Sequence, residues 1–193
     1  MHLVLASGSP YRRELLQRLG LPFIVDAPDI DEAARAGESA SELVVRLAET
    51  KARAVGARHA RSLVIGSDQV ALVGDTVLNK PGTASTAVAQ LQALRGNRAR
   101  FLTGLCLLNV ATGRAHIALE ECSVAFRRVS DVAIARYVER ERPIDCAGAF
   151  KAEGLGIALF ESIHTNDPTT LIGLPLIRLV TMLAAEGVDV LTV

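Results

Sequence analysis

The segment that most constrains the fold lies near the N-terminus, where an apolar run gives way within a few residues to a helix-like pattern. Leu3–Ala6 is followed by Ser7-Gly8-Ser9-Pro10-Tyr11-Arg12-Arg13. A strand that ends at small hydroxyl residues and restarts as a helix, with Pro10 near its first position, directs unpaired backbone N–H groups at one point. Two arginines in the first turn oppose the helix dipole, so a bound polyanion explains them better than helix stability does. The segment predicts a phosphate site, although a capped helix with surface arginines explains it equally well taken alone.

Composition limits the classes to which the chain can belong. Half of its 193 residues are apolar, and no linker, repeat or low-complexity tract divides it, so we expect one domain spanning residues 1–193. Its formal net charge is zero, which indicates neither a nucleic-acid nor a membrane partner. There is no leader-like start and no run of about 18 uncharged apolar residues, which favours a soluble, cytoplasmic protein.

Cysteines and histidines give no pattern typical of a disulfide framework or a metal site. Cys106, Cys122 and Cys146 are an odd number at wide spacings, and they read as small buried hydrophobic residues of a reducing compartment. The four histidines are scattered along the chain without metal-ligand spacing. The sequence therefore predicts no histidine metal site.

Strand-like and helix-like patterns alternate, which favours a mixed α/β fold with a central cleft. The expected strands cover residues 3–6, 23–26, 62–67, 70–73, 76–78, 100–110 and 114–128, and the expected helices cover residues 10–19, 39–59, 84–94, 130–140 and 175–185. The helix over residues 39–59 has the clearest signal, because Ser39 and Glu42 form a capping box ahead of an apolar stripe. Lys51 falls along that stripe, so it either snorkels at the edge or reaches into a site.

An aspartate follows the apolar strand predicted over residues 62–67. In open α/β sheets ligands bind beyond the carboxyl ends of strands, so Asp68 at that end is a candidate catalytic residue, with a turn or cap aspartate as the even alternative. The next two strands read as a hairpin that delivers Asn79-Lys80-Pro81-Gly82. No P-loop is present, and Gly154-Leu155-Gly156 lacks the context of a dinucleotide fingerprint. What remains is a distributed set of charged residues: Arg12, Lys51, Lys80, Lys151, Glu32, Asp68 and Glu153.

Five motifs resemble, in order and spacing and nearly from end to end, those of the Maf family of nucleoside triphosphate pyrophosphatases. They are Ser7-Gly8-Ser9-Pro10-Tyr11-Arg12-Arg13-Glu14-Leu15-Leu16, Gly66-Ser67-Asp68-Gln69, Lys80-Pro81, Ala147-Gly148 with Lys151-Ala152-Glu153-Gly154, and Gly173-Leu174-Pro175-Leu176. Within the family the chain looks like the YceF branch, whose implied substrate is 7-methyl-GTP. The pyrimidine branch, which acts on dTTP and UTP, typically shows S-P-R-R, D-T and K-A-G-A-Y-x-I-Q-G instead. One position departs from the family: Asn79 replaces the usual glycine, and because Asn tolerates a left-handed backbone, Lys80 can still be delivered.

The resemblance implies a Maf/ITPase-like α/β fold, a mixed twisted sheet flanked by helices around a central cleft. It also implies a divalent metal cofactor (Mg²⁺, Mn²⁺ or Co²⁺) and hydrolysis to pyrophosphate and a nucleoside monophosphate. Glu32 and Asp68 would hold the metal, and Asp68 is alternatively the proton acceptor. The phosphate-binding residues would be Ser7, Ser9, Arg12, Lys51, Lys80 and Lys151. The implied partner is a modified nucleoside triphosphate. The sequence does not fix the oligomeric state, for which a homodimer is one candidate.

The same resemblance assigns substrate specificity to Tyr11, Gln69 and Glu153. N7-methylation makes the guanine ring cationic, so the aromatic face of Tyr11 would attract it, and the Glu153 carboxylate would accept both hydrogen bonds from the guanine edge. Without the resemblance, Tyr11 reads as a packing residue and Glu153 as a surface acid. A dTTP/UTP pyrophosphatase and a low-turnover nucleotide-binding regulator of septum formation are the alternative functions.

Overall fold

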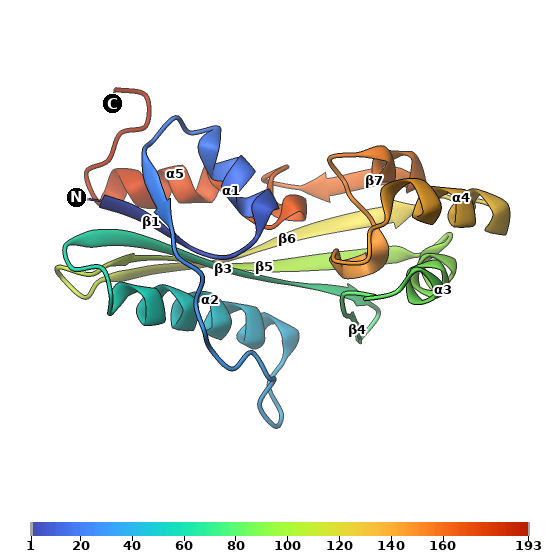
Figure 1. Ribbon diagram of the computed structural model, residues 1–193, viewed down its shortest axis with the longest axis horizontal. Helices are drawn as coiled ribbons and strands as arrows, with labels where there is room; N and C mark the ends of the chain where they lie inside the picture. The colour runs from blue at the N-terminus through green and yellow to red at the C-terminus, as the bar shows by residue number, and fades with distance from the viewer. Residues whose placement is uncertain (1, 193) are drawn as a thin grey trace. The chain divides into compact units, whose positions relative to one another are not determined.

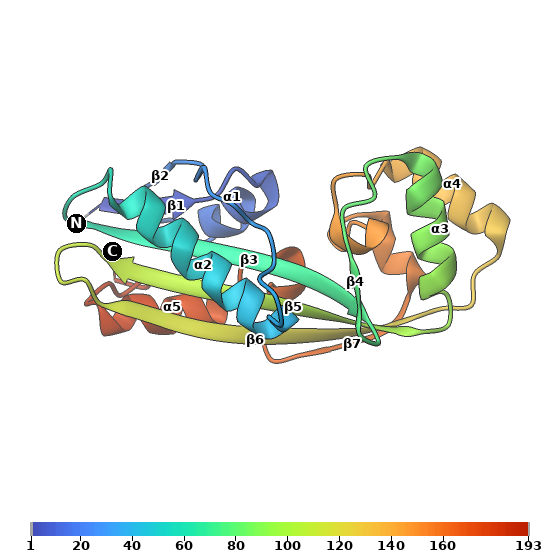
Figure 2. The same ribbon diagram turned by 90° about the horizontal axis from the view of Figure 1, so that it is seen from below.

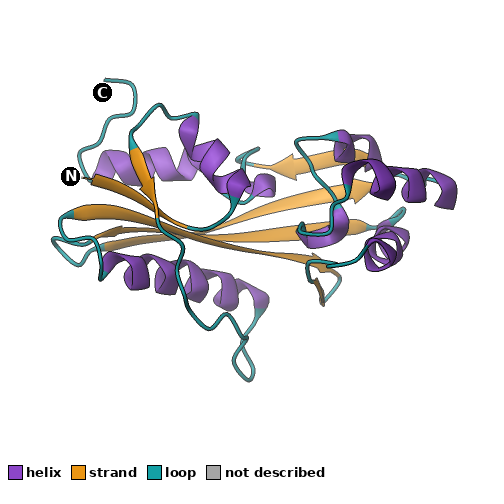
Figure 3. Cartoon of the chain, viewed as in Figure 1, coloured by secondary structure: helices purple, strands orange, loops and turns teal. Residues whose placement is uncertain are grey.

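The computed structural model describes residues 2–192 and shows an α/β fold with a mixed sheet (Figures 1 and 3). Its strands are β1 (His2–Ala6), β2 (Phe23–Val25), β3 (Ser62–Val73), β4 (Thr76–Leu78), β5 (Arg98–Asn109), β6 (Ala115–Phe126) and β7 (Phe160–Thr165). The helices are α1 (Pro10–Gln17), α2 (Ala40–Gly56), α3 (Ala84–Leu94), α4 (Asp131–Glu141) and α5 (Leu176–Ala185), with 3₁₀ turns η1 (Ala147–Ala149), η2 (Leu155–Leu159) and η3 (Thr170–Ile172).

Strand order within the described residues is β2-β1-β3-β5-β6-β7, with β4 paired to β3. β1 is parallel to both β2 and β3, whereas β3 with β4 and β6 with β7 are antiparallel. The expected mixed sheet is therefore confirmed. By its internal contacts the chain divides into a first unit of residues 2–69, 102–120 and 167–192 and a second unit of residues 70–101 and 121–166. Strands β3, β5 and β6 contribute residues to both units. The expectations of one domain and of a central cleft stay predictions.

The first unit has a three-layer arrangement, because the strands of its sheet are apolar on both faces. Alternate strand residues point to opposite faces, so Leu5, Ile65 and Leu105 pack with α1 and α5, while Val4, Val64 and Cys106 pack with α2. In Figures 1 and 2, α2 accordingly lies on one face and α1 and α5 on the other. Strands covered on both faces read as continuous apolar runs, which explains the composition of β1 and β3.

Two glycines let α2 lie directly on the sheet. A Cβ atom added to Gly66 in β3 would lie 2.0 Å from the carbonyl oxygen of Ala48, and one added to Gly104 in β5 would lie 2.1 Å from that of Val44. Both neighbours are helix backbone, which cannot move aside as a flexible side chain can. The close approach fixes the distance of α2 from the sheet, against which the helix lies in Figure 2. It therefore also fixes the position of Lys51, a residue of α2.

The second unit is organised around four phenylalanines in edge-to-face contact. The ring of Phe150 lies 5.3 Å from that of Phe101, 5.5 Å from that of Phe126 and 4.9 Å from that of Phe160, measured between centroids. Such pairs contribute about 0.5–1.5 kcal/mol each beyond the area they bury. Phe150 directly precedes Lys151, so this aromatic cluster fixes the start of the loop that carries Lys151 and Glu153.

Several elements confirm the sequence analysis, and two correct it. The capping box of α2 and Pro10 at the first position of α1 are present. The predicted strand end at Asp68 is wrong: β3 continues through Asp68 to Val73, because its second half pairs with β4 after β1 has ended. Strand β7 was not predicted. No helix of residues 2–192 is long and apolar enough to cross a membrane.

The three cysteines are free thiols. Cys106 and Cys122 are buried as expected, and burial raises the pKa of Cys106 to about 12 and that of Cys122 to about 11. Cys146 is only partly buried, which corrects the expectation that all three lie in the interior.

We expect Gly66→Ala to lower the free energy of unfolding by about 1–3 kcal/mol or more, since overpacking against rigid backbone forces the helix away from the sheet. Denaturant titration measures the loss. Gly56→Ala in α2 is the matched control, because the nearest atoms to its added Cβ are side-chain carbons, of Leu108 at 3.0 Å, Val110 at 3.1 Å and Val64 at 3.9 Å. If both variants lose the same stability, the close helix–sheet approach is not the constraint inferred here.

Candidate active site

Three of the predicted site residues meet at a buried lysine in the first unit. Lys51 Nζ lies 2.6 Å from Asp68 Oδ1 and 2.8 Å from Glu32 Oε1. Lys51 and Asp68 are only 6% and 8% exposed, whereas the side chain of Glu32 is 57% exposed. Lys51 therefore reaches inward from α2, and the alternative that it snorkels at the helix edge is wrong. A buried ammonium is stable only when paired, which ties α2 to β3 at this point.

Arg12 is held by neutral groups. Its Nε donates to the carbonyl oxygen of Gly173 at 2.8 Å and its Nη1 to Ser7 Oγ at 3.5 Å, and no ion pair involves Arg12 within residues 2–192. Burial lowers the pKa of the Arg12 guanidinium from its ordinary value, although the charges of Asp68 and Glu32 act to raise it. A shielded guanidinium without its own carboxylate is suited to a bound anion. We name Arg12, Glu32, Lys51 and Asp68 the charged cluster.

The strand-to-helix turn positions Arg12 as the sequence predicts. Ser9 is the N-cap of α1, and its side chain accepts a hydrogen bond from the backbone N–H of Arg12. Ser7 Oγ accepts from the backbone N–H of Ser9 at 3.1 Å. Both hydroxyls act as acceptors in these bonds, and a hydroxyl that accepts still has a proton to donate to an anion.

The residues beside Asp68 bind a different part of the first unit. Ser67 Oγ donates to the carbonyl oxygen of Gly173 at 2.9 Å, and Gln69 Nε2 donates to that of Thr170 at 2.8 Å. Gln69 Nε2 also lies 2.9 Å from Thr103 Oγ1. Because side chains alternate along a strand, Asp68 faces Lys51 while its two neighbours face residues 170–173. Sequence reasoning gave no role to Ser67, Thr103 or Gly173, and the only signal was that Gly66-Ser67 and Gly173 belong to the motifs shared with the Maf family.

The remaining charged residues lie in the second unit, which is described by itself. Lys80 follows β4 and is exposed, and Glu153 is exposed in the loop before η2. Lys151 donates from Nζ to the carbonyl oxygen of Glu141 at 2.8 Å and from its backbone N–H to Tyr137 Oη at 2.9 Å. Asn79 is not among the residues with positive φ, so the departure from the family glycine requires no left-handed backbone. That these residues act with the charged cluster on one ligand stays a prediction.

A divalent cation is compatible with the charged cluster only if the ligand supplies most of its coordination. No group of three or more His, Cys, Asp or Glu residues suited to a metal is present within residues 2–192. Lys51 binds one oxygen each of Asp68 and Glu32, which leaves the second oxygen of each carboxylate for an ion. Magnesium is commonly held by one or two carboxylates together with substrate phosphates. Glu32 and Asp68 would therefore hold a divalent cation together with a phosphate-bearing ligand.

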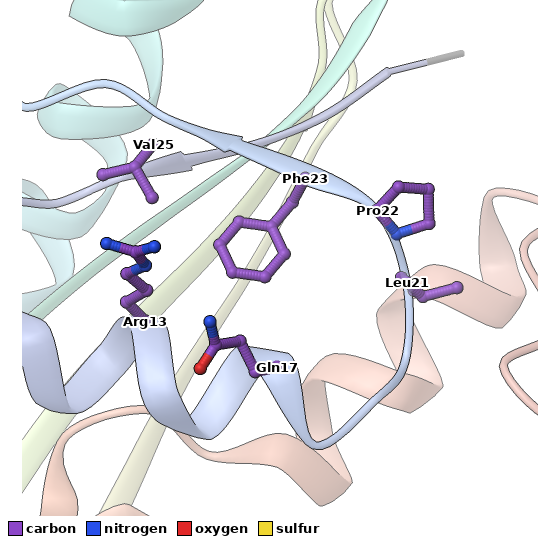
Figure 4. A pocket seen from close by; sticks show the side chains of 6 residues that line it. All are labelled: Arg13, Gln17, Leu21, Pro22, Phe23 and Val25. Carbon is purple, nitrogen blue, oxygen red and sulfur yellow. The ribbon is translucent and has the colours of Figure 1, made fainter.

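The two adjacent arginines diverge. Arg13 is exposed and, with Gln17, Leu21, Pro22, Phe23 and Val25, lines an open pocket of about 420 Å³ beside α1 and β2 (Figure 4). None of the predicted site residues lines this pocket. Tyr11, between Pro10 and Arg12 in the first turn of α1, is half-buried. Only Arg12 of the pair thus belongs to the charged cluster.

We expect Arg12→Lys to weaken the binding of inorganic pyrophosphate at least about tenfold, because a lysine cannot present two parallel N–H groups to phosphate oxygens. Isothermal titration calorimetry measures the dissociation constant. Arg13→Lys is the matched control in the same helix turn and should bind within about twofold of the unmodified protein. Equal losses in the two variants would contradict the assignment of Arg12 as the anion ligand.

Comparison with known proteins identifies the family of the chain. Residues 2–186 match the family model described as Maf-like protein. Proteins named 7-methyl-GTP pyrophosphatase are similar over nearly the whole chain. That of Pseudomonas aeruginosa is 56% identical, covering 97% of this chain and 98% of its own. That of Alcanivorax borkumensis is 54% identical over 97% and 95% of the two chains, and that of Nitrosococcus oceani 53% over 98% and 95%. Because the family model and these relatives each cover nearly the whole chain, the chain belongs to the Maf family.

Proposed function

We propose that this protein hydrolyses 7-methyl-GTP to 7-methyl-GMP and pyrophosphate, removing a modified nucleotide from the cellular pool. The observation that supports this most is the charged cluster, in which Arg12 is free of ion pairs within residues 2–192 and lies near the buried pair of Lys51 and Asp68. Phosphate binding alone does not require a buried carboxylate at this place, so the cluster favours an enzyme over a regulator that only binds nucleotides. The choice of 7-methyl-GTP as the substrate rests on the names of relatives that are more than half identical to the chain.

The residues divide the chemistry between binding and proton transfer. Water attacks the inner phosphorus, an oxygen–phosphorus bond forms, and the bond to the second phosphate breaks so that pyrophosphate leaves. Arg12 binds phosphate oxygens through two N–H groups, and the hydroxyls of Ser7 and Ser9 donate to the same anion. Lys51 holds Asp68 in place, and Asp68 accepts the proton of the water or orients a cation. A divalent cation, when bound, neutralises the charge that develops on the phosphates.

In this proposal the remaining contacts of the substrate come from the other residues that the sequence analysis singled out. Lys80 and Lys151 add positive charge for the triphosphate, and Glu153 accepts hydrogen bonds from N1–H and the exocyclic amine of guanine. Tyr11 offers an aromatic face to the cationic methylated ring. The amide nitrogen of Gln69 is already bound to Thr170 and Thr103, so its contribution to specificity would come through its carbonyl oxygen.

The wider expectations belong to the same proposal. We expect a cytoplasmic homodimer that binds neither nucleic acid nor membrane and that depends on Mg²⁺, Mn²⁺ or Co²⁺. The zero net charge supports the absence of a nucleic-acid partner.

A screen of canonical and modified nucleoside triphosphates with each of the three metals tests the reaction. We expect 7-methyl-GTP to be the best substrate and to yield monophosphate and pyrophosphate, with ¹⁸O from labelled water in the monophosphate. Asp68→Asn, which is nearly isosteric, should lower turnover at least about 100-fold without loss of folding. Release of diphosphate and orthophosphate would refute the pyrophosphatase, and preference for dTTP or UTP would place the chain in the pyrimidine branch.

Base specificity gives a second test. Glu153→Ala should lower kcat/KM for 7-methyl-GTP about 10- to 150-fold, the cost of leaving the guanine edge unpaired in a partly dry site. Tyr11→Ala should cause a smaller loss that is greater for 7-methyl-GTP than for GTP, because only the methylated ring is cationic. Glu161→Ala, an exposed glutamate of the same unit as Glu153, is the control. If kcat/KM for pyrimidine triphosphates falls equally, Glu153 and Tyr11 stabilise the fold or contact the phosphates and do not recognise the base.

A further inference from the structure

The turn that binds Arg12 is itself fixed by a buried aspartate that the reaction does not use. Asp167 is 2% exposed and lies at the start of the segment 167–173, which we name the 167–173 turn. Its Oδ1 accepts from the backbone N–H of Thr169 at 2.9 Å and from Thr169 Oγ1 at 2.6 Å. Its Oδ2 accepts from the backbone N–H of Ile177 at 2.7 Å. Both carboxylate oxygens therefore bind the chain on either side of residues 170–173.

These bonds replace a cap that helix α5 lacks. The N-cap of α5 is Pro175, which has no side-chain hydrogen bond to offer. The first two N–H groups of the helix donate instead to Thr169 Oγ1, at 2.8 Å from Leu176, and to Asp167 Oδ2. A carboxylate at a helix N-terminus is stabilised by the helix dipole, so Asp167 is bound strongly at this place. The start of α5 and the start of the turn are thus joined through one side chain.

The turn presents carbonyl oxygens to the residues that surround Asp68. Gly173, with φ of 107°, directs its carbonyl oxygen at both Arg12 Nε and Ser67 Oγ. The carbonyl oxygen of Thr170 accepts from Gln69 Nε2 and from Thr103 Oγ1. One short turn consequently orients the phosphate-binding arginine and the two residues of β3 that flank Asp68. A shift of the turn would move all of them together.

We propose that Asp167 is a positioning residue, which acts through the 167–173 turn to hold Arg12 and the Asp68 segment of β3 in their working geometry. It does not touch the substrate. The proposal rests on the proposed function in that Arg12 is taken as the anion ligand. Misplacement by about 1 Å of a group that binds the transferred phosphate costs on the order of 100-fold in rate, so a residue of this kind is visible in kinetics.

Asp167→Asn tests the proposal with little change of shape. The asparagine amide has one oxygen acceptor, and its NH₂ group takes the place of the second carboxylate oxygen. Because an NH₂ group cannot accept from an N–H donor, the hydrogen bonds to Thr169 or the one to Ile177 are lost. We expect kcat/KM to fall at least about tenfold, measured well below the melting temperature of the variant. Glu186→Gln is the matched control at the opposite end of α5, where Glu186 is buried against Asn109 and His116. The kcat/KM of Glu186→Gln should stay within about twofold of that of the unmodified protein. An equal loss of kcat/KM in both variants would mean that Asp167 contributes only to stability.

A double-mutant cycle identifies the route of the effect. If Asp167 acts through the Arg12 side of the turn, adding Asp167→Asn to the Arg12→Ala variant should lower kcat/KM by less than about threefold further. If the two losses of kcat/KM instead multiply in full, the residues act independently and the proposal is contradicted. Calorimetry with inorganic pyrophosphate gives a readout without turnover, in which Asp167→Asn should bind about tenfold more weakly. The unmodified protein could prove unable to hydrolyse 7-methyl-GTP while Asp167→Asn still weakens pyrophosphate binding. That result would refute the proposed function and keep the positioning role of Asp167.

A second pair of variants covers the case in which Asp167→Asn does not fold. Thr169→Val removes the hydroxyl that links Asp167 to Leu176 while keeping the side-chain shape, and it should show the same losses of kcat/KM and of pyrophosphate binding. Thr169→Ser keeps the hydroxyl and should restore both to within about threefold. If the serine variant loses as much as the valine variant, or if neither loses activity, the turn does not position the site.

Discussion

The ammonium group of Lys51, buried between α2 and β3, is the constraint on which the rest of the first unit depends. An isolated ion moved into a protein interior costs several kcal/mol, and a pair of ions recovers this only when its geometry is good. Lys51 reaches both Asp68 and Glu32 within 2.8 Å, so the ammonium is shared between two carboxylates. Removing Lys51 would leave the Asp68 carboxylate buried without a positive partner, whereas removing the charge of Asp68 leaves Lys51 paired with Glu32. A buried pair of this kind adds little to stability by itself, which favours a role in the reaction.

The ion pair of Lys51 and Asp68 requires a short distance between α2 and the sheet. Lys51 can reach Asp68 only if α2 lies low on the sheet, and Gly66 and Gly104 provide that by having no side chain beneath the helix backbone. On the other face of β3, Ser67 and Gln69 bind the 167–173 turn. Asp68 is thus fixed from both faces of one strand. The alternation of side chains converts three consecutive residues into contacts with two different layers.

The sequence predicts the α/β fold, the capping box of α2 and the strand-to-helix turn at Arg12, because each depends on local signals that the structure confirms. It places Asp68 at the wrong point of its strand. Asp68 lies beyond the end of β1, whose last residue Ala6 pairs with Gly66, so the rule that sites lie past carboxyl ends holds for the neighbouring strand. After that point β3 continues because it pairs with β4, and local sequence patterns do not reveal this contact. Strand β7 was not predicted for the same reason, since it depends on pairing with β6.

The charged cluster by itself does not carry enough positive charge for the triphosphate of the proposed function. Arg12 and Lys51 carry two positive charges, and Glu32 and Asp68 carry two negative ones, so the charged cluster is neutral before a ligand binds. A triphosphate brings several negative charges, and Lys51 is already committed to the carboxylates. Arg12 alone cannot neutralise them. The proposed function meets this need with a divalent cation, with Lys80 and Lys151, or with both.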